Sequence, residues 1–135
     1  MREIEIVLPL PPRELSPNAR VCWAVKAKAA KLAKVEAKTT VKNALAERGL
    51  SALGFRPSCY NVVWVYKGRK PDADNVLASC KAFLDGIADA LGIDDRDLEC
   101  GGISRTHYMA YQHDEEIGVM EPQVAFVIYG NESEK

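Results

Sequence analysis

The chain has 135 residues, of which 47% are apolar and 27% charged, and its formal net charge is −1. This length and composition predict one soluble globular domain with a single core. They exclude a membrane-spanning protein, because no apolar run approaches the ~20 residues of a membrane span, and no signal peptide pattern is present.

The first strand is predicted over Arg2–Leu8, where polar and apolar residues alternate. The prolines within Pro9–Pro12 end it. The next segment, Ser16–Arg20, has the composition of a loop that leads into a helix, with Asn18 or Ser16 as the N-cap.

A long helix is predicted from about Val21 to Arg48, because this segment is rich in Ala, Lys and Leu and is followed by Gly49. We expect the helix to be broken or weakened near Thr39–Val41. Several lysines recur at steps of three and four residues and share roughly one face: Lys28, Lys31, Lys34, Lys38 and Lys42. Such a stripe suits phosphate contacts as well as plain solvation.

The clearest strand in the chain is Cys59–Lys67, which is rich in β-branched and aromatic residues. The segment Gly68–Pro71 ends this strand with two positive charges. The strand therefore delivers Asp72 and Asp74 to the edge of the sheet, on a loop beside the start of a helix.

The second helix is predicted from about Asn75 to Leu91, with Gly92 as its stop. Its predicted buried stripe consists of Leu77, Cys80, Leu84, Ile87 and Leu91. On an adjacent stripe, Lys81 shares a face with Asp74. An ammonium there would stabilise charge on a phosphate, although an exposed lysine paired with Asp85 is an equally good interpretation.

A short acidic connection, Ile93–Leu98, follows the second helix, and two further strands are predicted over Gly102–Tyr108 and Gln123–Tyr129. The polar segment between them, His113–Glu121, is predicted to be an exposed loop. The resulting order, β-α-β-α-β-β, predicts a single α+β domain over residues 1–135, with a small mixed sheet of about four strands and two main helices.

Charge is unevenly distributed along the chain. From Arg13 to Arg48, nine Lys or Arg stand against three Glu, a net charge of +6, whereas Asp114–Lys135 has six acids and one base, a net charge of −5. A nearly neutral total therefore hides a basic segment of the kind that a nucleic-acid backbone binds. A solvated amphipathic helix is the simpler explanation of the lysines alone.

The four cysteines are spread along the chain, with no C-x-x-C pair and no clustered histidines; they are Cys22, Cys59, Cys80 and Cys100. A zinc site is therefore not expected. Buried, reduced thiols are the usual state of such cysteines inside cells. We accordingly expect a cytoplasmic protein.

Four aspartates stand at the two ends of the second helix: Asp72 and Asp74 before it, Asp94 and Asp95 after it. Helix capping explains one of them. Several carboxylates that converge on one site most often bind a hard divalent cation, because they repel one another without it. A calcium-binding EF-hand loop is excluded, since its sixth position requires Gly and here holds Leu77.

Three segments together resemble the RusA-type Holliday junction resolvases, a family of crossover junction endodeoxyribonucleases. They are Pro71-Asp-Ala-Asp-Asn75, the helix with Lys81-Ala-Phe-Leu-Asp85, and Ile93-Asp-Asp95 before a strand. The opening Leu8–Pro12 with Ser16–Arg20 is similar to phage and prophage members. The resemblance covers nearly the whole chain.

By this resemblance, the protein is a hydrolase that resolves four-way DNA junctions in recombination and repair by paired, symmetrical phosphodiester cleavage. The resemblance assigns Mg²⁺, for which Mn²⁺ can substitute, to Asp72, Asp74 and Asp95, with Asp94 as the supporting acid. Carboxylate-bound Mg²⁺ neutralises the phosphate and activates water, so no His or Cys ligand is needed.

A functionally important lysine in that family stands four residues after the second acid of the motif, where this chain has Ala78. Here the lysine follows by seven residues, at Lys81, and its spacing to Asp85 still matches. We therefore assign the role to Lys81. Asp85 and Asp97 are additional acids that could share or replace a ligand role.

A four-way junction is cut at two symmetrical positions, so the resemblance also implies a two-fold homodimer with one active site in each subunit. The basic residues expected to hold DNA phosphates are Arg20, Lys28, Lys31, Lys34, Lys38, Arg69 and Lys70. Two other functions remain open: an Mg²⁺-dependent nuclease that acts on flaps or forks, and a non-catalytic module that binds branched DNA.

Overall fold

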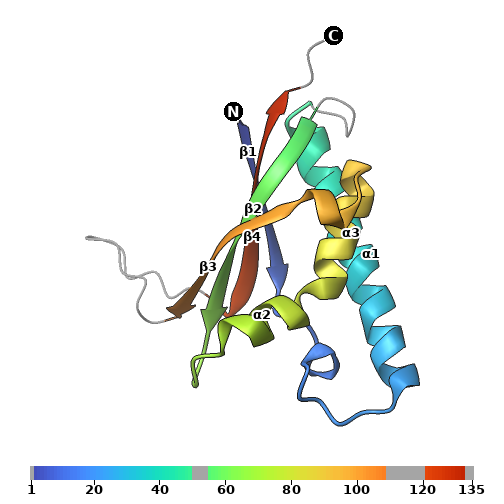
Figure 1. Cartoon of the computed structure of the whole chain (residues 1–135), viewed down its shortest axis with the longest axis vertical. Coiled ribbons are helices and arrows are strands. Elements are labelled where there is room, and N and C mark those ends of the chain that lie inside the picture. Colours follow the sequence, from blue (N-terminus) through green and yellow to red (C-terminus); the bar gives the residue numbers. More distant parts are fainter. Residues whose placement is uncertain (1, 50–54, 109–120, 133–135) are drawn as a thin grey trace.

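A four-stranded mixed sheet forms one layer of the fold, and α1 and α3 lie side by side against one face of it (Figure 1). The computed structural model describes residues 2–49, 55–108 and 121–132. The strands are β1 (Arg2–Pro9), β2 (Phe55–Tyr66), β3 (Glu99–His107) and β4 (Gln123–Glu132). The helices are α1 (Trp23–Glu47), α2 (Ala73–Ser79) and α3 (Lys81–Leu91), with short 3-10 helices η1 (Arg13–Leu15) and η3 (Asp95–Asp97).

The strand order in the sheet is β1-β4-β2-β3. β4 pairs antiparallel with both β1 and β2, and β2 pairs parallel with β3. The last strand of the chain therefore lies between the first two, and β2 occupies a central position. The predicted α+β class, with a small mixed sheet of four strands, is confirmed.

The core lies between the sheet and the helices, as the period-2 pattern of the strands requires. In β1, alternate residues are buried and the residues between them are exposed; the buried ones are Ile4, Ile6 and Leu8. Phe126 of β4 packs edge to face against Phe83 of α3, with ring centroids 6.3 Å apart. The predicted helical stripe also contributes, since Cys80, Ile87 and Leu91 are buried and Leu77 and Leu84 pack against the core.

The predicted range of the first helix is approximately right, but its predicted N-cap residue and its predicted weak point were wrong. Cys22 is the N-cap residue, and its side chain makes no capping bond. Ser16 instead accepts a 3.3 Å hydrogen bond from the Asn18 N–H within a local turn. The helix continues through Thr40, whose hydroxyl donates to the Glu36 carbonyl at 2.8 Å. Burial of Val41 against the core outweighs the low helix propensity of this segment.

The second predicted helix is divided in two at Cys80, which has φ −90° and ψ 0°. The Cys80 N–H donates to the carbonyls of both Val76 and Leu77, so the last turn of α2 tightens before α3 begins. No Gly or Pro marks this position in the sequence. The thiol is buried, and burial raises the pKa of Cys80 to about 12.

The strands are longer than predicted. β2 begins at Phe55 because a register shift near Pro57 accommodates the proline in the sheet, and β3 begins at Glu99. Most of the predicted loop His113–Glu121 lies outside the described residues.

All four cysteines are free, but only Cys80 is buried, so the predicted burial was wrong for the exposed Cys22 and Cys100 and for the half-buried Cys59. In the described part of the chain, no helix is both long and apolar enough to cross a membrane.

Candidate functional site

The first acid pair lies where the central strand β2 ends and α2 begins. Gly68, with φ +86°, makes the turn after the strand, and Asp72 occupies the N-cap position of α2. The Asp72 carbonyl accepts the first helical bond, from the Val76 N–H at 3.0 Å, but its carboxylate makes no capping bond. Asp74 is exposed in the first turn. Capping therefore does not explain the Asp72 side chain.

Arg105 of β3 holds the loop that carries these acids. It is half-buried opposite Trp64 of β2, and its Nη1 donates a 3.0 Å hydrogen bond to the carbonyl oxygen of Pro71. A charged donor makes this bond stronger than a neutral one. β3 thus fixes the peptide bond directly before Asp72. No local pattern in the sequence points to Arg105, because its contact depends on the register of β3 on β2.

In the second acid pair, Asp94 has a structural role. Its carboxylate accepts hydrogen bonds from the backbone N–H and from Nη2 of Arg96, each 3.0 Å long, and it thereby caps η3. The Arg96 side chain is the main cause that lowers the pKa of Asp94 to about 2. Helix capping, which the sequence predicted for one of the four acids, is thus the role of Asp94.

We expect the Asp94 carboxyl to titrate near pH 2 in a carbon-detected NMR titration. Because the folded pKa lies below the usual ~3.9 of aspartate, its contribution to stability is present above that value and disappears as the pH falls through about 2. In Arg96→Gln the midpoint should rise toward ~3.9. A midpoint that is the same in both proteins would show that Arg96 is not the cause.

Lys81 forms an ion pair with each of two carboxylates. Its Nζ lies 3.0 Å from Asp85 Oδ1 and 2.5 Å from Asp95 Oδ2, and the bond to Asp95 is the main cause that raises the pKa of Lys81. The predicted pairing with Asp85 is thus present. Because the helix divides at Cys80, Lys81 and Asp74 do not share one face of a continuous helix. The lysine therefore pairs with Asp95 of the second acid pair rather than with an acid of the first.

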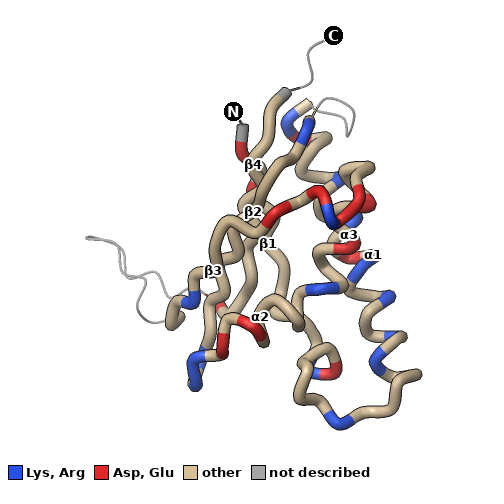
Figure 2. Tube along the Cα trace, viewed as in Figure 1, with Lys and Arg blue, Asp and Glu red and all other residues tan. Residues whose placement is uncertain are grey.

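The structure does not bring the two acid pairs together within one chain. β2 and β3 run parallel, Asp72 and Asp74 follow the carboxyl end of β2, and Asp94 and Asp95 precede the amino end of β3. Figure 2 shows two separate acidic segments, one at α2 and one between α3 and β3. Among the described residues, no three or more His, Cys, Asp and Glu side chains form a group that could hold a metal ion.

The donor chemistry of the first pair nevertheless fits Mg²⁺. Asp72 and Asp74 are exposed, and neither carboxylate forms a hydrogen bond or ion pair with another described residue. Mg²⁺ is usually bound by one or two carboxylates together with substrate phosphates, and it keeps several waters. The donor chemistry of the pair therefore fits a magnesium ion that shares its coordination with a phosphate, rather than an ion enclosed by four carboxylates.

Basic residues lie on two sides of Asp72 and Asp74. Arg69 and Lys70 are exposed in the loop that leads to Pro71. Figure 2 shows further basic residues in the connection before α1 and in the first turns of α1, toward the end of the molecule where α2 begins. Clustered positive charge around an acidic pair is an arrangement that can hold a phosphate backbone across the acids.

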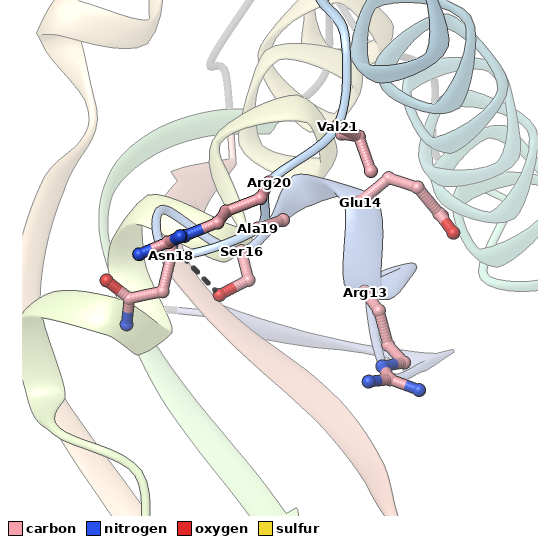
Figure 3. A pocket seen from close by; sticks show the side chains of 7 residues that line it. All are labelled: Arg13, Glu14, Ser16, Asn18, Ala19, Arg20 and Val21. Carbon is pink, nitrogen blue, oxygen red and sulfur yellow. Dashed lines mark hydrogen bonds between the residues drawn. The ribbon is translucent and has the colours of Figure 1, made fainter.

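The connection before α1 forms a hollow of about 510 Å³ that Arg13 and Arg20 both line. Figure 3 shows Arg20 and Asn18 on one side of this hollow and Arg13 and Glu14 on the other. Both arginine side chains are exposed. The two guanidinium groups thus extend the basic surface rather than converge on one point.

The lysine stripe of α1 divides into two parts. Lys38 is bound to Asp89 of α3, with Nζ and Oδ2 2.9 Å apart, and this bond lowers the pKa of Asp89. Lys34 lines a hollow with acids of α3 and of the connection that follows it. Lys28 and Lys31, nearer the start of the helix, are exposed. Lys34 and Lys42 are exposed as well, so within the described residues Lys38 is the member of the predicted stripe whose charge is held by an ion pair.

No family model matches the chain. An uncharacterized protein of Xylella fastidiosa (strain Temecula1) is 43% identical over 95 residues, which are 67% of this chain and 60% of that protein. The chain thus spans less than two thirds of the length of this relative.

Two solved structures resemble the chain only weakly. One is the hydrogenase maturation protein HypE in complex with ATP, with 12% identity over 97% of this chain and 30% of that chain and a TM-score of 0.33. The other is 2C-methyl-D-erythritol 2,4-cyclodiphosphate synthase from Plasmodium vivax, with 8% identity over 94% of each chain and a TM-score of 0.33. Likeness at this level carries no argument about function.

Proposed function

We propose that the protein is a cytoplasmic, Mg²⁺-dependent endodeoxyribonuclease of the RusA type, which resolves four-way DNA junctions. The observation that carries the proposal is the exposed pair Asp72 and Asp74 at the end of central strand β2, whose carboxylates have no partner among the described residues and follow the basic loop of Arg69 and Lys70. Capping leaves the Asp72 carboxylate unexplained. The resemblance of the segment from Pro71 to Asn75 to the family motif supports the same function.

The residues of the chain have distinct tasks in this proposal. Arg69 and Lys70 bind the DNA backbone as it reaches the acids, and Arg105 keeps the loop in place by its bond to Pro71. Asp72 and Asp74 would hold the metal, which when bound neutralises the phosphate and lowers the pKa of water. Lys81 and Asp95 form an ion pair that orders the connection after α3.

The symmetry of the substrate supports a homodimer. Two cuts at symmetrical positions require two active sites, which a two-fold dimer of this chain supplies. Sedimentation or light scattering of the protein alone and with a junction would test this assembly. A monomer that makes both cuts would contradict it.

Cleavage of a panel of labelled DNA molecules tests the substrate class. We expect cutting of a synthetic four-way junction, with much weaker cutting of a flap, a fork and a linear duplex of the same sequence. Equal cutting of all branched molecules would indicate a structure-selective nuclease without preference for junctions. Binding without cutting would instead support a non-catalytic module that binds branched DNA.

Binding of the junction should weaken steeply with salt. With about four phosphate contacts, affinity falls about 100-fold between 50 and 200 mM salt. Replacing both Arg69 and Lys70 by Gln should reduce the slope of log affinity against log salt by about 2. The matched control is Lys38→Gln, because Lys38 is already paired with Asp89. If the affinity of the wild type for the junction does not depend on salt, the basic residues do not bind the DNA phosphates.

A second candidate is a non-catalytic module that binds branched DNA. It is favoured by one observation: Asp94 and Asp95 are both occupied by basic partners, Arg96 and Lys81, in the described structure. In this function the acids have only structural roles, and the basic loops bind the DNA backbone. It predicts that no divalent cation produces cleavage and that Asp→Asn exchanges leave DNA binding unchanged.

A further inference from the structure

A second hollow adjoins the acid pair, between α2 and the segment from Leu10 to Ser16. It has a volume of about 300 Å³ and includes Trp64 of β2 in its lining. Pro71, Asn75 and Ser79 line its α2 side. The two segments are far apart in the sequence and meet only because β1 and β2 lie in one sheet.

The hollow lies next to the proposed active site, because Pro71 and Asn75, which line it, flank Asp72 and Asp74 in the chain. Asn75 and Ser79 stand at positions i and i+4 on one face of α2, and Asp72 is the N-cap residue directly before this helix. Asp72 directly follows Pro71 in the chain, and Pro71 is part of the lining. A nucleotide whose phosphate lies at the acids would therefore have its base within reach of the hollow.

The lining suits a planar heteroaromatic ring with polar edges. Apolar surface comes from the prolines of the connection and from Trp64, while the amide of Asn75 and the hydroxyl of Ser79 form no hydrogen bond with other described residues. Arg13 also lines the hollow and supplies a positive charge. The volume is at the low end for ligand sites, which matches one nucleotide rather than a duplex.

We propose that this hollow binds one unpaired nucleobase of the branched DNA, next to the phosphate that is cut. The proposal rests on the proposed nuclease function and adds the part of the substrate that positions the cut. Taking a base out of the stack costs least where its pairing or stacking is already weakened, as at the point where the strands exchange. Contact with an aromatic side chain such as Trp64 compensates for that cost.

Junctions with a single abasic nucleotide test the proposal without any change to the protein. The abasic position is moved through three nucleotides on each side of the cut, and single-turnover cleavage rates are measured. We expect the wild type to lose about 10-fold in rate at one position, since stacking of one base on an aromatic side chain is worth about 5- to 150-fold. The other positions should change the rate by less than about 2-fold.

A variant that fills the hollow provides the second measurement. Ser79→Leu should cut the intact junction about 10-fold more slowly and should no longer distinguish the intact junction from the sensitive abasic one. The matched control is Ser104→Leu, because Ser104 is exposed on β3 and its neighbour Arg105 points to the other face of the sheet. Thermal melting of both variants establishes that they are folded.

The outcomes separate this inference from the function on which it rests. If the wild type cuts every abasic junction at the normal rate, or if folded Ser79→Leu keeps the base dependence, the nucleobase site is refuted while junction cleavage stands. If the wild type cuts no junction at all, the proposed function falls and the nucleobase site falls with it.

Discussion

Asp74→Asn should abolish measurable junction cleavage and leave junction binding within about 3-fold of the wild type. The exchange preserves the shape of the side chain but removes the negative charge that a hard cation requires. A bound metal contributes several kcal/mol to phosphodiester cleavage, and each 1.36 kcal/mol is a factor of ten, so the rate falls by at least about 100-fold. Single-turnover cleavage and a gel-shift titration measure the two effects.

The control for this prediction is Asp97→Asn, which removes the same charge from an exposed position in η3. The sequence left Asp97 open as an additional ligand, but it lies in the acidic segment between α3 and β3, apart from Asp72 and Asp74. It should keep cleavage within about 3-fold of the wild type, because one exposed charge away from the bound phosphate has little effect on the rate. Normal cleavage by Asp74→Asn would remove Asp74 from the metal site. Equal losses in both variants would show that overall acidity, rather than this position, matters.

Gly86→Ala should destabilise the fold by about 2 kcal/mol and lower Tm by roughly 5–10 °C. Gly86 lies where α3 crosses α1, and a Cβ added there would stand 2.3 Å from the Lys34 carbonyl oxygen and 3.0 Å from Ala37 Cβ. The backbone of one helix must move to relieve this contact. Alanine is otherwise the better helix former by about 1 kcal/mol, so a net loss shows that helix packing decides.

Gly102→Ala is the matched exchange. A Cβ there meets only the Asn61 side-chain oxygen, at 3.7 Å, which is an ordinary contact. We expect Tm to stay unchanged or to rise slightly, because alanine loses less backbone entropy than glycine on folding. Thermal denaturation measures Tm, and chemical denaturation measures the free energy of unfolding, for both variants. A stable Gly86→Ala protein would mean that α1 and α3 can separate without cost.

The sequence was sufficient for features that depend on short-range pattern. Alternating residues predicted β1, and β-branched residues predicted the centre of β2. The place of Asp72 at the end of that strand followed from the same pattern, because the strand and the following helix are adjacent in the chain. The secondary structure near the first acid pair could therefore be predicted from the sequence.

Features that depend on distant contacts were not accessible. The division of the second helix at Cys80 has no local signal, since it depends on how α3 packs against α1 and the sheet. The bond from Arg105 to Pro71 depends on strand register. The choice of Lys81 as partner of Asp95, rather than of Asp74, follows from that division. Spacing along one ideal helix could not reveal it.

Mapping of nicks on a synthetic four-way junction with each strand labelled in turn tests the central claim most directly. In the presence of Mg²⁺ we expect two nicks, at symmetrical positions on opposite strands, and none after chelation of the metal or in Asp74→Asn. Intact strands at every Mg²⁺ and Mn²⁺ concentration, with the junction bound, would contradict the account and leave a protein that binds branched DNA without cutting it.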